Sequence, residues 1–177
     1  LFCGRLDQLA NKGAITFFFK SIWPQLADQV NTIEVDVVGK NPPAWLRELS
    51  LRDSRVHVPG FVDDVRPYFQ KATIFVCPIM DGGGTRLKIL DALAMGMPIV
   101  STTFAASGLD LRDGAHLLLA DTPETMIDQI RRLLGNRALR EQLAQGAVNV
   151  VQQTYSWDKI GHSLVAAYEA AFELKVR

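Results

Sequence analysis

A chain of 177 residues is long enough for one globular domain of ordinary size. Its 48% hydrophobic and 21% charged residues are typical of a protein with a sizeable core and exclude a disordered chain. Nineteen Lys and Arg residues balance nineteen Asp and Glu residues, so no net positive charge would attract nucleic acid. Cys3 and Cys77 both lie in apolar runs, which indicates buried thiols of a reducing compartment, not a disulfide framework or a zinc site.

The beginning of the sequence indicates a piece of a longer protein. Residue 1 is not Met, and the first residues form an apolar run without the basic start and small-residue cleavage site of a signal peptide. No apolar stretch approaches the ~20 residues that a membrane-spanning helix needs. We therefore expect a cytoplasmic fragment.

Strand-like and helix-like segments alternate along the chain. In chain order, we predict a strand over residues 1–5, a helix over 14–30, a strand over 33–38, a short helix that opens at 42–43, a strand over 56–58 and a helix over 63–71 with Asp63 and Asp64 in its first turn. We then predict a strand over 73–78, a helix over 85–95, strands over 99–101 and 116–120, and helices from 124 onward with breaks at 135–136 and 154–156. This alternation is typical of an α/β fold with a doubly wound parallel sheet, which is Rossmann-like. No linker divides residues 1–177, so we expect a single domain.

Three glycines, Gly82, Gly83 and Gly84, lie between an expected strand and an expected helix. Ligands of open α/β sheets bind at this edge, and glycine lets the backbone approach a ligand without a Cβ clash. The first N–H groups of the helix have no partners within it and can bind a phosphate, and Arg86 and Lys88 add positive charge there. The Gly-Lys-Ser/Thr ending of a Walker loop is missing. The alternative is a plain flexible loop in which Arg86 and Lys88 are merely solvated.

Asp91 interrupts an apolar helical run, where an acid is costly unless something pairs with it. Its carboxylate can accept hydrogen bonds from both hydroxyls of a ribose whose phosphates are held at the helix start. The alternative is an ion pair with Lys88, three residues earlier on the same helix.

The run of residues 82–96, followed by 98–102, resembles the signature of family 4 glycosyltransferases, which are retaining enzymes of the GT-B architecture. Further matches lie in register at Gly4-Arg5-Leu6, Val38-Gly39, Pro59-Gly60-Phe61-Val62 with Asp64, Asp113-Gly114 and Tyr155-Ser156-Trp157. The resemblance covers the whole chain but only the C-terminal, donor-binding half of such an enzyme. It implies a domain that binds a nucleotide-diphospho-sugar, with an N-terminal acceptor-binding domain outside residues 1–177.

The resemblance also implies roles for residues near the glycines. Asp91 takes the place of the Glu that holds the donor ribose. Gly83 stands where the first signature Glu of the family contacts the donor sugar, so that side-chain contact is lost, as in a glycine-rich subgroup. The diphosphate cradle of the family matches Gly84, Thr85, Arg86 and Leu87. Gly82 and Lys88 lie on either side of this cradle and are also expected to contact the donor.

Other roles fall on residues outside this loop. Arg5 matches the family Arg that faces the diphosphate, and Lys12 matches the accompanying Lys, although their separation of seven residues exceeds the commonest family spacing. Phe61 and Val62 match the position of the base, and a hydrophobic turn is the alternative there.

The implied chemistry follows from charge. Negative charge gathers on the leaving diphosphate as the glycosyl–phosphate bond breaks, and Arg5, Lys12 and the helix N-terminus would stabilise it. Such a site needs no metal or cofactor. The three histidines lie far apart without ligand spacing and are expected to be structural; they are His57, His116 and His162.

The resemblance predicts a hexosyltransferase-like, retaining enzyme that moves a sugar from a UDP-, GDP- or ADP-linked donor to a glycan or lipid. An epimerase of the same architecture and a non-catalytic nucleotide-binding module are the alternatives. We expect the isolated chain to bind nucleotide but to transfer little sugar, and any peripheral membrane contact to involve the missing domain.

The predicted C-terminal helices cover about residues 155–175. The last helix has an apolar face formed by Leu164, Val165, Tyr168, Ala171 and Phe172. In complete enzymes a terminal helix often returns to the first domain, so part of this face would be exposed here. The alternative is ordinary packing on its own domain.

Overall fold

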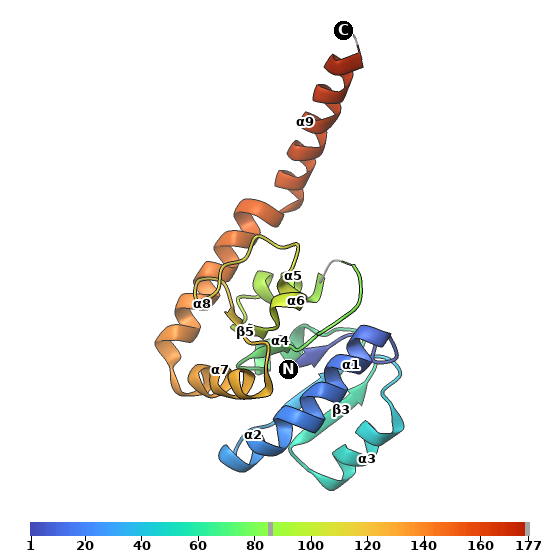
Figure 1. Ribbon diagram of the computed structural model, residues 1–177, viewed down its shortest axis with the longest axis vertical. Coiled ribbons are helices and arrows are strands. Elements are labelled where there is room, and N and C mark those ends of the chain that lie inside the picture. Colours follow the sequence, from blue (N-terminus) through green and yellow to red (C-terminus); the bar gives the residue numbers. More distant parts are fainter. Residues whose placement is uncertain (85–86, 176–177) are drawn as a thin grey trace.

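The computed structural model describes residues 1–84 and 87–175, with side chains up to Phe172 (Figure 1). Within these ranges the strands are β1 (Phe2–Cys3), β2 (Val35–Val38), β3 (Val56–Gly60), β4 (Phe75–Cys77), β5 (Ile99–Ser101) and β6 (Leu118–Leu119). The α-helices are α1 (Leu9–Phe17), α2 (Trp23–Gln29), α3 (Ala44–Arg52), α4 (Arg66–Lys71), α5 (Leu87–Ala94), α6 (Thr103–Ala106), α7 (Pro123–Gly135), α8 (Arg137–Val150) and α9 (Trp157–Lys175). Two π-helical segments, η1 (Phe18–Ile22) and η2 (Val151–Tyr155), join α1 to α2 and α8 to α9.

The strands form two parallel three-stranded sheets, in the orders β1-β2-β3 and β4-β5-β6. Two hydrogen bonds join the sheets at Leu1. The Leu1 amino group donates to the carbonyl oxygen of Ile74 at 2.9 Å, and the N–H of Val76 donates to the carbonyl oxygen of Leu1 at 2.9 Å. The combined order is therefore β3-β2-β1-β4-β5-β6, which is the order of a dinucleotide-binding Rossmann fold. The predicted parallel α/β class is confirmed.

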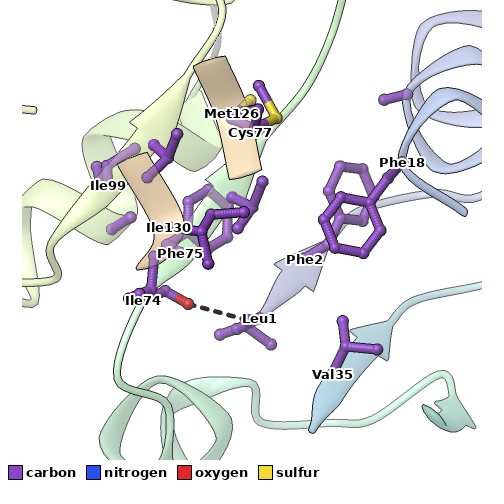
Figure 2. Close-up of a cluster of buried hydrophobic side chains, with 14 of the residues drawn as sticks. Leu1, Phe2, Phe18, Val35, Ile74, Phe75, Cys77, Ile99, Met126 and Ile130 are labelled. Atoms are coloured by element: carbon purple, nitrogen blue, oxygen red, sulfur yellow. Dashed lines mark hydrogen bonds between the residues drawn. The ribbon is translucent and has the colours of Figure 1, made fainter. Parts of the chain in front are cut away.

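The hydrophobic core spans the junction of the two sheets. Figure 2 shows Phe2, Phe18 and Val35 on one side of Leu1, and Phe75, Ile99, Met126 and Ile130 on the other. Phe75 is fully buried and stacks on Phe69 of α4, with 5.5 Å between the ring centroids. Burying a side chain of this size contributes about 1.5–3 kcal/mol. Cys77 is buried, as its apolar run predicted, and Cys3 is only partly buried.

Two predicted helix starts are wrong. The first helix begins at Leu9, not at 14, and the N–H of Lys12 donates to the carbonyl oxygen of Gln8 at 2.8 Å. Helix α4 begins at Arg66, so Asp63 and Asp64 precede its first turn. The Asp64 carboxylate accepts a hydrogen bond from the backbone N–H of Arg66 at 2.9 Å, which satisfies a donor at the helix start from outside the helix.

Helix α6 is absent from the prediction because it has only four residues. Thr102 begins it, because its hydroxyl accepts a hydrogen bond from the N–H of Ala105 at 3.0 Å. The helix expected over 85–95 is described from Leu87 onward, and Thr85 and Arg86 lie outside the described residues.

Helix α9 extends away from the rest of the domain (Figure 1). Its side chains from Trp157 to Phe172 are exposed, including those of Leu164, Val165 and Tyr168 on the apolar face. The alternative in which this face packs on its own domain is therefore wrong. Among the helices described, none is long and apolar enough to cross a membrane.

Candidate functional site

The strand order reverses between β1 and β4, and ligands of doubly wound sheets bind beyond the carboxyl ends of the strands at this point. Strand β1 leads there into Gly4 and Arg5, and then into α1. Strand β4 leads into the loop of residues 78–84, and then towards α5. The fold thus brings two predicted segments that are distant in the sequence to one edge of the sheet.

Close backbone contact fixes the end of β1 against the end of β2. Gly4 has φ +149° and Gly39 has φ +154°, a region that side chains disfavour. A Cβ at Gly39 would overlap the carbonyl oxygen of Gly4. The N–H of Gly4 donates to the carbonyl oxygen of Val38 at 3.0 Å, and the N–H of Gly39 donates to that of Gly60 at 2.8 Å. The three strand ends are therefore held together at the edge where Arg5 begins the next turn.

A pocket of about 340 Å³ opens beside these strand ends. Its lining residues are Cys3, Gly4, Arg5, Val38, Gly39, Lys40, Phe61, Val62 and Val65. The structure thus brings together Arg5, Phe61 and Val62, three residues that the sequence singled out. Phe61 is 58% exposed, and the Nζ of Lys40 lies 4.2 Å from the centroid of its ring. An exposed aromatic ring beside a cation can stack on a flat aromatic ligand.

The Arg5 guanidinium is held by a carboxylate that the sequence analysis did not single out. Its Nε and Nη2 donate to Asp7 Oδ1 and Oδ2 at 3.2 and 3.1 Å. Asn41 Nδ2 donates to Asp7 Oδ2 at 2.9 Å. The hydrogen bonds from Arg5 and then Asn41 lower the pKa of Asp7 to about 2. The pair is exposed, so solvent screening keeps its contribution to the stability of the fold small.

Lys88 reaches the same strand end from α5. Its Nζ donates to Asn11 Oδ1 at 2.6 Å and lies 4.4 Å from the centroid of the Phe2 ring. Asn11 is only 5% exposed, and its Nδ2 donates to the carbonyl oxygen of Arg5 at 2.7 Å. The alternative in which Lys88 is merely solvated is therefore wrong. Asn11 was missed, although it lies four residues before buried Ile15 on the apolar face of α1, where a polar side chain needs a partner.

Asp91 lies on α5 three residues after Lys88, and no ion pair joins it to another of the described residues. Asp91 is exposed at the surface, and partial desolvation by the surrounding protein raises the pKa of its carboxyl group. Burial raises the pKa of the Cys3 thiol, Lys88 lowers it and Asp91 raises it further. The charges of α5 therefore lie beside the end of β1, and the predicted alternative of a Lys88–Asp91 ion pair is wrong.

The glycine-rich loop presents exposed backbone. Gly82 and Gly84 have φ +99° and +86°. No described heavy atom lies within 4 Å of where a Cβ would stand at Gly83 or Gly84. A Cβ at Gly13 of α1 would lie 3.7 Å from Asp81 Oδ1, so the loop faces the first turns of α1.

Four further predicted residues remain, two of them described by the structure and two not. Lys12 is exposed and directly precedes Gly13, and Leu87 is exposed at the start of α5. The predicted roles of Thr85 and Arg86 fall outside the described residues.

The histidines lie on separate elements. His57 on β3 lies 3.4 Å from Glu34, His116 Nδ1 accepts a hydrogen bond from the N–H of Arg112, and His162 contacts the carbonyl oxygen of Asp158. Within the described part of the chain, no three His, Cys, Asp or Glu side chains gather in a way that could hold a metal ion.

The reversal of strand order defines a Rossmann-like domain, with a pocket and an exposed glycine-rich loop at the carboxyl edge of the sheet as the candidate site. The chain belongs to the family Glycosyl transferases group 1, which matches residues 1–136.

Curated relatives carry transferase names. The phosphatidyl-myo-inositol mannosyltransferase of Mycobacterium leprae is 25% identical over 174 residues, which cover 96% of this chain and 46% of that protein. The D-inositol 3-phosphate glycosyltransferase of a Nocardioides species is 32% identical over 87 residues, 48% of this chain and 19% of that protein. The chain spans about half the length of the curated relatives that it matches along its whole length. These names favour a transferase over the epimerase alternative.

Solved structures share the fold. The C-terminal domain of LpcC, a glycosyl transferase group 1 family protein of Francisella tularensis, has a TM-score of 0.70 at 19% identity, covering 89% of this chain and 84% of that one. Anabaena HepE in complex with UDP has a TM-score of 0.78 at 14% identity, covering 96% of this chain and 48% of that one. At these identities the likeness shows the fold alone, and it agrees with the predicted Rossmann-like half.

Proposed function

We propose that this chain is the donor-binding half of a retaining glycosyltransferase that needs no metal and takes a nucleotide-diphospho-sugar as donor. The observation that carries the proposal is that Arg5 and the exposed glycine-rich loop both follow strand ends at the reversal point of a group 1 glycosyltransferase fold. A cation at this edge, where a loop leads into a helix, suits a diphosphate.

In this proposal the nucleotide lies across the edge of the sheet. The base stacks on Phe61 and contacts Val62, in the pocket that also contains Arg5. The ribose hydroxyls donate to Asp91. The diphosphate lies between Arg5 with Lys12 on one side and a cradle on the other. The cradle is formed by Gly84, Thr85, Arg86 and Leu87, with Gly82, Gly83 and Lys88 beside it.

The proposed chemistry is stabilisation of the leaving group. As the glycosyl–phosphate bond breaks, the diphosphate gains negative charge while the sugar becomes cation-like. Arg5 and Lys12 stabilise that charge electrostatically, and the start of α5 adds the partial positive charge of its N-terminus. Gly83 supplies no side chain for the sugar, so we infer that other groups recognise it.

The acceptor is proposed to bind a second, N-terminal domain, because the chain spans about half of its relatives. The Mycobacterium leprae relative is named for phosphatidyl-myo-inositol, and a glycan or lipid acceptor is proposed here by analogy. The proposed location is the cytoplasm, with any peripheral membrane contact made through the other half. The isolated chain is expected to bind nucleotide and to transfer little sugar.

Calorimetric titration of the chain with UDP, GDP and ADP tests the donor site. We expect saturable binding of one of them, which also identifies the base. If none binds, the titration is repeated on the two-domain protein. Absence of binding there as well would contradict the proposal, because the two-domain protein contains the complete site and would still not bind a nucleotide.

Replacing Asp7 with Asn is expected to tighten nucleoside diphosphate binding by a few-fold. The Asp7 carboxylate competes with the diphosphate for the Arg5 guanidinium, and the amide removes one negative charge near the site. The melting temperature should change little because the pair is exposed. Weaker binding by the variant would show instead that Asp7 orients Arg5 for the ligand.

A further inference from the structure

Three elements that surround the proposed diphosphate site meet at one buried amide. Asn11 of α1 accepts a hydrogen bond from Lys88 of α5 through Oδ1, at 2.6 Å, and donates to the carbonyl oxygen of Arg5 through Nδ2, at 2.7 Å. The amide thus uses both of its ends to connect the helix after the glycine-rich loop with the turn after β1.

The fold makes room for this arrangement at Gly4. A Cβ there would lie 2.7 Å from Lys88 Nζ and 2.9 Å from Asn11 Nδ2, so the ammonium and the amide occupy the space beside this glycine. The ring of Phe2 lies 4.4 Å from the same ammonium and offers its negative face. The Lys88 ammonium is therefore held under the strand end by an amide oxygen and an aromatic ring.

The orientation of the Asn11 amide is determined by its partners. The ammonium only donates and the Arg5 carbonyl only accepts, so Oδ1 must face Lys88 and Nδ2 must face Arg5. Neither contact survives if the amide is reversed. The two hydrogen bonds of Asn11 therefore fix the distance between the start of α5 and the turn that contains Arg5.

We propose that Lys88 and Asn11 are positioning residues for the diphosphate, acting through the carbonyl group of Arg5. They hold the glycine-rich loop and the Arg5 turn at a fixed spacing, so that the diphosphate enters a preformed site. This inference rests on the proposed function and assigns Lys88 a supporting role in place of direct contact with the phosphates.

The test compares Lys88→Met, Asn11→Leu and the double variant with the unaltered chain. Each is titrated with whichever of UDP, GDP and ADP binds and with the matching nucleoside monophosphate. Lys20→Met is the control, because it removes an exposed lysine from η1. Melting temperature is measured for every variant. The two-domain protein replaces the chain if only that form binds.

We expect each single variant to bind the diphosphate about tenfold more weakly than the unaltered chain, with a much smaller loss for the monophosphate. The double variant should bind the diphosphate no more weakly than the single variant with the lower affinity. Lys20→Met should bind like the unaltered chain. Losses that multiply in the double variant would overturn the proposal, because Lys88 would then act on the ligand independently of Asn11. If a variant loses the same affinity for the diphosphate and the monophosphate and also has a lower melting temperature, the proposal is wrong and the residues only stabilise the fold.

Amide hydrogen exchange gives a second readout that needs no nucleotide. The N–H groups of Leu6 and Gln8 donate to Lys40 and Arg5 in the turn that Asn11 supports. Lys88→Met should speed their exchange at least several-fold while the β4 and β5 amides stay protected. Unchanged exchange at Leu6 and Gln8 would overturn the proposal even if nucleotide binding supports the donor site. If no nucleotide binds either form of the protein, the proposed function fails and this inference fails with it.

Discussion

The Asp91→Ala variant is expected to bind the nucleoside diphosphate about 10- to 100-fold more weakly than the unaltered chain. A hydrogen bond to a charged group contributes roughly 1.5–3 kcal/mol, and 1.4 kcal/mol corresponds to a tenfold change in affinity. Partial desolvation already raises the pKa of this exposed carboxyl group, and no ion pair with another described residue compensates its charge. A ribose would supply the missing donors. Calorimetric titration measures the effect.

The stability of the same variant separates a ligand role from a structural one. Asp91 is exposed, so removing its carboxylate should leave the melting temperature unchanged or slightly raised. Asp91→Glu is the matched control, since it keeps the carboxylate and should retain most of the affinity. A lowered melting temperature together with normal nucleotide binding would contradict the assignment of Asp91 to the ribose.

Gly39→Ala is expected to destabilise the chain by about 2–5 kcal/mol, from steric overlap and backbone strain together. The added Cβ would overlap the carbonyl oxygen of Gly4, and φ at this position is +154°. For a chain of this size the melting temperature should fall by roughly 5–15 °C. Thermal unfolding followed by circular dichroism measures the change.

Gly135→Ala is the matched control for Gly39→Ala. Gly135 ends α7, has no described heavy atom within 4 Å of a Cβ, and is not among the glycines with positive φ. Alanine favours the helix there by up to about 1 kcal/mol, so this variant should melt at the same or a higher temperature. Equal melting of the two variants would show that the strand ends at Gly4 and Gly39 can separate without cost.

The alternation of strands and helices was predictable because each element depends on local apolar patterns. The order of the strands was not, because it depends on pairs that are distant in sequence. Leu1 bonds to Ile74 and Val76, and nothing near Leu1 in the sequence indicates those partners. The short helix α6 was also missed, since a single turn leaves no periodic pattern.

The candidate site shows the same division. The glycine-rich loop and Asp91 could be identified from residue types at short spacings. The partner of Lys88 could not, because Asn11 lies 77 residues away and reaches it only in the folded chain. Lys40 likewise contacts the Phe61 ring across two strand ends. The Asp7 carboxylate that binds Arg5 also accepts a hydrogen bond from Asn41, 34 residues away.

Helix α9 makes the domain mechanically asymmetric. At 1.5 Å per residue its 19 residues extend about 28 Å, so a rotation of about 10° at its base displaces the far end by about 5 Å. The base is η2, where the hydroxyl of Tyr155 accepts a hydrogen bond from the N–H of Asp110. The helix is therefore a lever arm that pivots at η2, a segment that also packs against α5 and α8. A fluorophore near Phe172, paired with one on α8, would report small changes in the pivot angle as large changes in distance.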